Sequence, residues 1–193
     1  MAIRDIIEEG DPILGKNCRH IIDFNDRLHI LLDDMRETLI KANGLGLAAP
    51  QVGVLRRVCI IVDSPEESEE LDDFVEPDES DSEDKDEDVD EDDDNEIVII
   101  EMINPVILDS EEEQSGLEGC LSVPGVNGIV TRPKTVTVKA QDRHGKEFTF
   151  MCSNLTARAV CHEIDHLNGQ LFTRLVEKYL THEEVEEMRR ENK

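Results

Sequence analysis

The sequence predicts one α+β domain spanning residues 1–193, in which antiparallel-leaning β-sheets pack around a central helix bearing an HExxH motif, with a further helix at the C-terminus. Three observations lead to this class. The length suits one ordinary domain. Some segments repeat apolar residues with the period of a helix, and others show the apolar runs or alternation of strands. Helices and antiparallel-leaning strands in one short chain indicate an α+β arrangement.

The first helix is predicted over residues 25–42, NDRLHILLDDMRETLIKA. Asn43-Gly44 supplies its stop signal. The apolar residues of this segment recur at the spacing of one helical face: Leu28, Leu31, Leu32, Met35 and Leu39.

A loop and two strands are expected next. The loop is the Gly- and Ala-rich stretch GLGLAAPQVG (44–53), and RRVCIIV (56–62) reads as the first strand. EIVIIEMINPVIL (96–108) reads as the second, and Asn104-Pro105 is expected to end or bulge it because proline cannot donate to a strand ladder.

The second half begins with a predicted loop, EGCLSVPGVNGIVTRP (118–133), which leads into KTVTVKAQD (134–142). The alternation of Thr, Val and Lys there is typical of a half-buried strand. HGKEFTFM (144–151) is expected to be its hairpin partner.

Two helices complete the chain. NLTARAVCHEIDHLNG (154–169) has a helical pattern closed by Gly169. A short amphipathic helix is expected over THEEVEEMRRENK (181–193).

Residues 64–96 stand apart in composition. They hold 21 of the 47 acidic residues and one of the 20 basic ones, so they account for most of the net charge of −27. Like charges repel, and so polar a stretch cannot bury enough apolar surface to fold alone. We therefore predict a disordered acidic insertion between two strands.

The rest of the composition bears on compartment and partners. No apolar run is long enough to span a membrane, and the start MAIRDIIEEGD lacks the basic residues of a targeting peptide. Five irregularly spaced cysteines favour a reducing compartment over a disulfide framework. No basic patch with interleaved aromatic residues suggests nucleic acid. We expect a cytoplasmic protein that contacts neither membrane nor nucleic acid directly.

The motif CHEIDH (161–166) is the strongest chemical signal. Each helical residue turns by about 100°, so His162 and His166 lie about 40° apart on one face and can reach one metal ion. Glu163 stands beside them, where it can take a proton from a bound water.

Two zinc-peptidase patterns supply a third ligand in different ways. The long pattern HExxHxxGxxH needs a histidine six residues after His166, where this chain has Phe172, so it fails. The other takes a glutamate from a second helix. Glu186, 20 residues after His166, is the candidate, although a solvated glutamate-rich face explains it as well.

Cys120, in EGCLS, is an alternative third ligand. Gly119 beside it allows close backbone approach, and a thiolate flanked by small residues suits ligation. Cys161 directly precedes His162 and so points about 100° away from the ligand face. It is expected to pack, and the remaining cysteines are expected to be buried small residues: Cys18, Cys59 and Cys152.

Gln51 is the only side chain in the loop GLGLAAPQVG that can donate to a developing oxyanion. The glycines there allow backbone to approach a ligand, although a simple turn explains them equally well.

Together GLGLAAPQ (44–51), EGCLS (118–122) and HEIDH (162–166) resemble, in order, the three signature motifs of the peptide deformylase family. The resemblance covers nearly the whole chain outside residues 64–96, and VPG and LNGQLF after the second and third motifs fit as well.

The resemblance implies roles for these residues. Glu163 would be the general acid/base, and Gln51 with the backbone N–H of Leu121 would contact the reacting oxygen. Fe²⁺ would be the usual metal, with Zn²⁺, Ni²⁺ or Co²⁺ as substitutes. The metal ligands would be Cys120, His162 and His166.

It also implies the reaction, the removal of the N-formyl group from formylmethionine at the start of newly made proteins, with release of formate. The partners would be N-formylmethionyl peptides or nascent chains, close to the ribosome. A pocket for the methionine side chain is also implied, and it would be lined by Gly44, Leu45, Gly46, Leu155 and Ala159. Burial in the core is an alternative explanation for Leu155 and Ala159.

Two other functions remain open on the residues alone. One is an HExxH zinc peptidase that uses Glu186. The other is a non-catalytic module whose acidic segment recruits basic partners, or captures divalent ions loosely.

Overall fold

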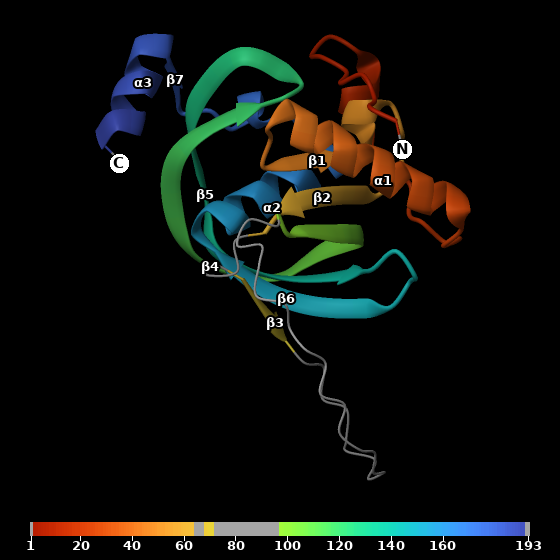
Figure 1. Ribbon diagram of the computed structural model, residues 1–193. Helices are drawn as coiled ribbons and strands as arrows, with labels where there is room; N and C mark the ends of the chain where they lie inside the picture. The colour runs from red at the N-terminus through yellow and green to blue at the C-terminus, as the bar shows by residue number, and fades with distance from the viewer. Residues whose placement is uncertain (1, 64–67, 72–96, 192–193) are drawn as a thin grey trace, which may run out of the picture.

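The computed structural model describes residues 2–63, 68–71 and 97–191. These residues form a mixed fold of helices and antiparallel sheet (Figure 1). The helices are α1 (Asp26–Ala42), α2 (Asn154–Leu167) and α3 (His182–Glu191), with short 3₁₀ turns η1 (Pro12–Gly15), η2 (Ala49–Val52) and η3 (Phe172–Arg174). The strands are β1 (Gly46–Ala48), β2 (Val58–Val62), β3 (Ser68–Leu71), β4 (Ile99–Cys120), β5 (Val123–Gln141), β6 (Glu147–Ser153) and β7 (Lys178–Leu180).

Every pairing between these strands is antiparallel. They follow the order β1-β2-β4-β5-β6-β3, and β7 pairs with β5. The four predicted strand segments correspond to β2, β4, β5 and β6, and the two later predicted helices correspond to α2 and α3. The loop prediction for residues 44–53 missed two short elements, β1 and η2, which are too short to show a period.

β4 and β5 form one long hairpin that curves around α2 (Figure 1). The prediction that residues 118–133 are a loop is wrong, because both arms of the hairpin run through them. Asn104-Pro105 bulges β4 without ending it, since the pairing shifts register between Ile103 and Val106. Residues 108–113 are exposed, so their side chains carry no burial period for the sequence to show.

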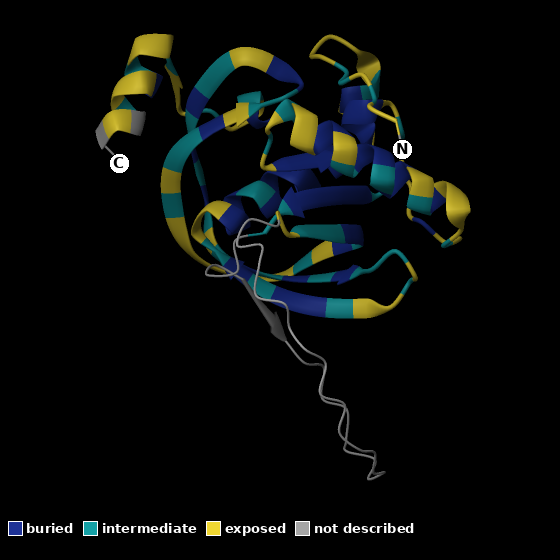
Figure 2. Ribbon diagram, viewed as in Figure 1, coloured by how far each residue is buried: buried dark blue, intermediate teal, exposed yellow. Residues whose placement is uncertain are grey.

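β2 lies between the two larger helices and is covered on both faces. Val58 and Ile60 belong to the apolar cluster that includes α1, whereas Cys59 and Ile61 belong to the cluster that includes α2. Alternate side chains of a strand point to opposite faces, so burial on both sides explains the unbroken apolar run VCIIV. In Figure 2 the β2 ribbon is mostly dark blue, the colour of buried residues.

α1 covers the predicted segment 25–42 except for its first residue. The Asn25 side chain caps it by accepting hydrogen bonds from the N–H groups of Arg27 and Leu28. Asn43 adopts the left-handed conformation, with φ of 51°, and ends the helix. The predicted apolar face is buried: Leu28, Leu31, Leu32, Met35 and Leu39.

Part of the predicted acidic insertion is structured. Ser68–Leu71 form β3, which pairs with β6 from Ser68 opposite Cys152 to Leu71 opposite Thr149. The prediction of disorder across the whole of 64–96 is therefore wrong at these four residues, because the edge of β6 offers backbone partners that offset the ordering entropy. Residues 64–67 and 72–96 lie outside the described residues.

The C-terminal end of α2 is fixed by Gly169. This residue has φ of +68° and donates its N–H to the carbonyl of His166, so the chain leaves the helix just after the C-cap residue Asn168. A Cβ added at Gly169 would lie 2.7 Å from the carbonyl group of Gly15 and 2.9 Å from Lys16 N. The motif helix is therefore held against η1 by direct backbone contact.

No helix in the described ranges combines the length and the apolar character needed to cross a membrane.

We predict that Gly169→Ala destabilises the protein by more than about 3 kcal/mol, because it adds a backbone clash to the left-handed penalty of about 1–2 kcal/mol. Gly125→Ala is the matched control, since Gly125 has φ of +76° but nothing within 4 Å of an added Cβ. Urea unfolding of both variants measures the difference. Equal losses would show that the contact with η1 contributes nothing.

Candidate metal centre

α2 presents two histidines toward one point. His162 and His166 are four residues apart on this helix, and their ring centroids lie 5.0 Å apart. Both are buried, at 8% and 1% exposure. Phe172, at the position where a third histidine of the long peptidase pattern would stand, packs against the ring of His162 as a buried core residue.

The third donor comes from the last residue of β4. Cys120 Sγ lies 3.2 Å from His166 Nε2. One ligand atom from each of Cys120, His162 and His166 can be chosen so that all three lie within 4.8 Å of one another. A thiolate and two imidazoles within that distance fit a four-coordinate divalent ion with one position left open.

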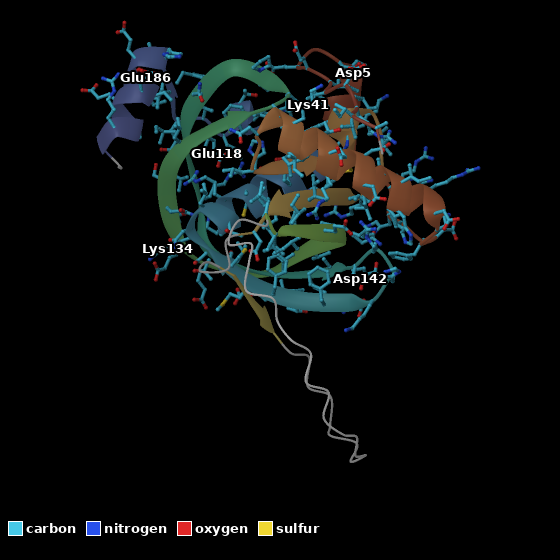
Figure 3. All side chains as sticks on the ribbon, in the orientation of Figure 1. Asp5, Lys41, Glu118, Lys134, Asp142 and Glu186 are labelled. Carbon is cyan, nitrogen blue, oxygen red and sulfur yellow. The ribbon has the colours of Figure 1, made fainter. Side chains whose placement is uncertain are left out.

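Glu186 does not join this group. It is exposed on α3 and accepts a hydrogen bond from Arg190, 3.2 Å away. Figure 3 places Glu186 at the edge of the molecule, whereas Glu118 is labelled over the body. The glutamate-rich face of α3 is solvated, and the peptidase alternative lacks its ligand.

Glu118 orients the first histidine. Its Oε2 accepts a hydrogen bond from His162 Nδ1 over 3.1 Å, which leaves Nε2 of that ring for a ligand. Burial by itself raises the pKa of Glu118, but hydrogen bonds from His162 and Arg132 outweigh it and lower the pKa to about 2. The residue is therefore a buried carboxylate at neutral pH.

Two arginines share this carboxylate. Arg132 donates to Glu118 from Nε and Nη2 over 2.9 and 3.1 Å and also pairs with Asp165. Arg158 donates from Nη1 to Glu118 Oε1 over 2.9 Å. The sequence did not predict that Arg132 and Arg158 pair with Glu118. These pairs are separated by 14 and 40 residues, and such separations leave no local pattern.

The protonation of the two rings follows from their surroundings. Burial lowers the pKa of His166 to about 3, so this imidazole is neutral, the form that binds metals. Burial also lowers the pKa of His162, but hydrogen bonds to Cys120 and Glu118 outweigh it and raise the pKa to about 10. A cation that coordinates His162 therefore displaces a proton.

Glu163 lies in a space that Gly46 leaves open. A Cβ at Gly46 would stand 2.5 Å from Glu163 Oε1, so only glycine fits there. Burial raises the pKa of Glu163 to about 7, which lets it accept and return a proton near neutral pH. Its Oε2 is buried without a hydrogen-bond partner among the described residues.

Gln51 is held in one orientation. Its Oε1 accepts a hydrogen bond from Ala48 N over 2.8 Å, which identifies the other amide atom as the NH₂ group. That Nε2 lies 3.2 Å from Ser122 Oγ and 3.7 Å from Cys120 Sγ. The amide N–H groups of this buried side chain thus point toward the cysteine end of the site.

A cavity of about 380 Å³ opens beside these groups. Leu155 is 48% exposed on its rim, so the interpretation of this residue as core is wrong; the start of α2 faces the opening there. Ala159 is half-buried and borders both the cavity and the core. The lining includes every residue that the resemblance assigned to the methionine pocket: Gly44, Leu45, Gly46, Leu155 and Ala159.

Comparison with known proteins assigns the family. Residues 3–180 match the family model for polypeptide deformylase. The chain belongs to the polypeptide deformylase family. A peptide deformylase of Acetivibrio thermocellus is 44% identical over 193 residues, which cover 100% of this chain and 94% of the relative. One from Agathobacter rectalis is 41% identical, covering 97% of this chain and 100% of the relative.

Solved structures of the polypeptide deformylase family have the same fold. A peptide deformylase from Legionella pneumophila superposes with a TM-score of 0.71 at 35% identity, covering 98% of this chain and 92% of that one. A class I type b peptide deformylase from Acinetobacter baumannii, solved with Met-Ala-Ser bound, gives a TM-score of 0.72 at 30% identity, covering 91% and 99%. The resemblance of the three motifs is therefore confirmed at the level of family and fold.

We predict that Glu118→Gln weakens metal binding about 10- to 100-fold, because His162 Nδ1–H then donates to a neutral amide instead of a charged carboxylate. Competition with a chelating dye measures the dissociation constant. Glu101→Gln is the control, since Glu101 also pairs with a half-buried arginine, Arg143, but outside the site. Equal affinity in the wild type and Glu118→Gln would show that this contact does not support the metal.

Proposed function

We propose that this chain removes the N-formyl group from the N-terminal formylmethionine of newly made proteins and releases formate. One observation carries the proposal: around a single cavity, the chain sets a Cys–His–His donor group beside a buried carboxylate and an oriented amide. Membership of the polypeptide deformylase family supports the same reaction.

The proposed metal ligands are Cys120, His162 and His166. Fe²⁺ is the proposed ion, with Zn²⁺, Ni²⁺ or Co²⁺ as substitutes; thiolate and imidazole donors suit these divalent metals. When bound, such an ion lowers the pKa of a water molecule and polarises the oxygen of the formyl group.

The other roles belong to the protein itself. Glu163 takes a proton from the attacking water, and its unpartnered, buried Oε2 supports this role. The Nε2 of Gln51 and the backbone N–H of Leu121 donate to the formyl oxygen as negative charge develops on it. Glu163 then gives the proton to the leaving amine, which frees the new N-terminus.

The methionine side chain of the substrate would enter the 380 Å³ cavity, between the start of β1, with Gly44 and Gly46, and the first turns of α2. The bound Met-Ala-Ser of the Acinetobacter relative supports a peptide that begins with methionine. Because this substrate arises during translation, the proposal includes a cytoplasmic place of action close to the ribosome.

We also infer that residues 1–193 form one domain, interrupted by the acidic insertion at about 64–96 except where Ser68–Leu71 form β3. The place of α2 at the centre of the fold is supported by its apolar residues Val160 and Ile164, which share a buried cluster with β2, β5 and β6.

We predict that Glu163→Gln lowers the rate constant for formate release by at least about 10²-fold, because the amide cannot take a proton from water. The assay follows formate from formyl-Met-Ala-Ser with metal-loaded protein. Glu187→Gln, an exposed change on α3, serves as the control. If the metal-loaded wild type releases no formate, the proposed function is wrong.

We also predict that Cys120→Ser abolishes tight metal binding, whereas Glu186→Ala leaves metal content and formate release unchanged. A hydroxyl is a poorer ligand than a thiolate for these ions, and Glu186 is an exposed residue of α3 that pairs with Arg190. Metal analysis of the purified variants gives the answer. The opposite pattern would restore the peptidase alternative.

A further inference from the structure

Arg158 is a buried arginine on the face of α2 that borders the cavity. It is 6% exposed and lies one turn after Leu155 and one turn before His162, and all three line the cavity. Arginine is rarely buried to this extent unless its charge is paired and its donors are used. Its partners therefore indicate what this position requires.

The guanidinium of Arg158 ties α2 to both arms of the long hairpin. Nη1 lies 2.9 Å from Glu118 Oε1 and 2.9 Å from the carbonyl oxygen of Val130 on β5. Nη2 donates to the carbonyl oxygen of Gln114 on β4 over 3.2 Å. One planar group thus connects α2 with β4 and β5, and residues of all three elements line the cavity.

Gly116 makes room for this group. A Cβ added there would lie 3.0 Å from Nη2 and 3.3 Å from Cζ of Arg158. The guanidinium therefore packs closely against β4 at Gly116, and its hydrogen bonds limit how far it can move away.

The arginines and the carboxylates of the network around Glu118 balance in charge. Arg132 and Arg158 provide two positive charges, and Glu118 and Asp165 provide two negative ones. Removal of the Arg158 charge would leave Glu118 with a single arginine partner beside His162. A buried carboxylate that loses part of its compensation is strongly disfavoured.

We propose that Arg158 is a positioning residue of the deformylation site: it holds Glu118 in place behind His162, and it fixes the wall of the cavity that receives the substrate side chain. The aliphatic stem of Arg158 gives that wall an apolar surface, as the stem of a long charged residue can. The clamp on β4 and β5 keeps the cavity narrow enough to favour an unbranched side chain such as methionine over a branched one such as leucine. This inference rests on the proposed function.

Two variants separate the charge from the clamp. Arg158→Met keeps an unbranched stem but removes both the charge and the hydrogen bonds. Arg158→Lys keeps the charge, but a single ammonium cannot serve both strands as the planar fork does. Gly116→Ala displaces the clamp and leaves every charged residue unchanged, so it tests the cavity wall even if Arg158→Met does not fold.

The experiment uses zinc-loaded protein and two measurements. The first is the rate of zinc loss to a chelating dye. The second is the ratio of kcat/KM for formyl-Met-Ala-Ser to that for formyl-Leu-Ala-Ser, with kcat and KM determined separately. Arg143→Met is the matched control, because Arg143 also binds two carboxylates, those of Glu101 and Asp33, but does not line the cavity.

We expect Arg158→Met to lose zinc about tenfold faster than the wild type, and Arg158→Lys to stay within about threefold of it. The preference for methionine should fall about tenfold in both variants and in Gly116→Ala, mainly through KM. Arg143→Met should change neither measurement.

Unchanged zinc loss and unchanged preference in folded Arg158→Met would overturn the inference while leaving the proposed function intact. Parallel changes in Arg143→Met would also overturn it, because they would show a general loss of stability. If the wild type releases no formate, the proposed function fails and so does the assignment of the cavity wall. Faster zinc loss from Arg158→Met would then still support the contact through Glu118.

Discussion

The site depends on one buried carboxylate. Glu118 sits near the end of β4 and is contacted by Arg132 from β5 and by Arg158 and His162 from α2. Leaving such a group without compensation would cost about 3–5 kcal/mol, so the partners have to stay in place whenever the protein is folded. That requirement sets the distance between the hairpin and the motif helix, and with it the distance between Cys120 and the two histidines.

Backbone contacts also hold the C-terminal end of α2. Gly169 turns the chain back against Gly15, and the N–H of Cys18 donates to the carbonyl of Leu167. The N-terminal segment continues this support, because Ile7 N donates to Gln51 O and Glu9 N donates to Ser122 O. Residues 7–9 therefore connect η2, which carries Gln51, with the hairpin turn beside Cys120.

The sequence could predict the features that have a local cause. α1 follows from its apolar spacing and its two asparagine caps, and the approach of His162 to His166 follows from helical geometry alone. The full length of β4 could not be predicted, because cross-strand backbone bonds hold a central stretch, residues 108–113, whose side chains are exposed. The contact between Arg158 and Glu118 joins residues 40 apart, and only the folded hairpin brings them together.

The choice among five cysteines shows how placement decides chemistry. Burial raises the pKa of Cys18 and Cys161 to about 11, and burial also raises that of Cys59 well above its ordinary value. The thiolate is the form that binds metals, so these three are poor ligands. Cys161 adjoins His162 in the chain, yet it belongs to the apolar cluster behind the helix. Cys120 is the only half-buried cysteine among the described residues, and it ends the strand that also carries Glu118. β4 therefore supplies both the candidate ligand Cys120 and the carboxylate of Glu118, which orients the ring of His162.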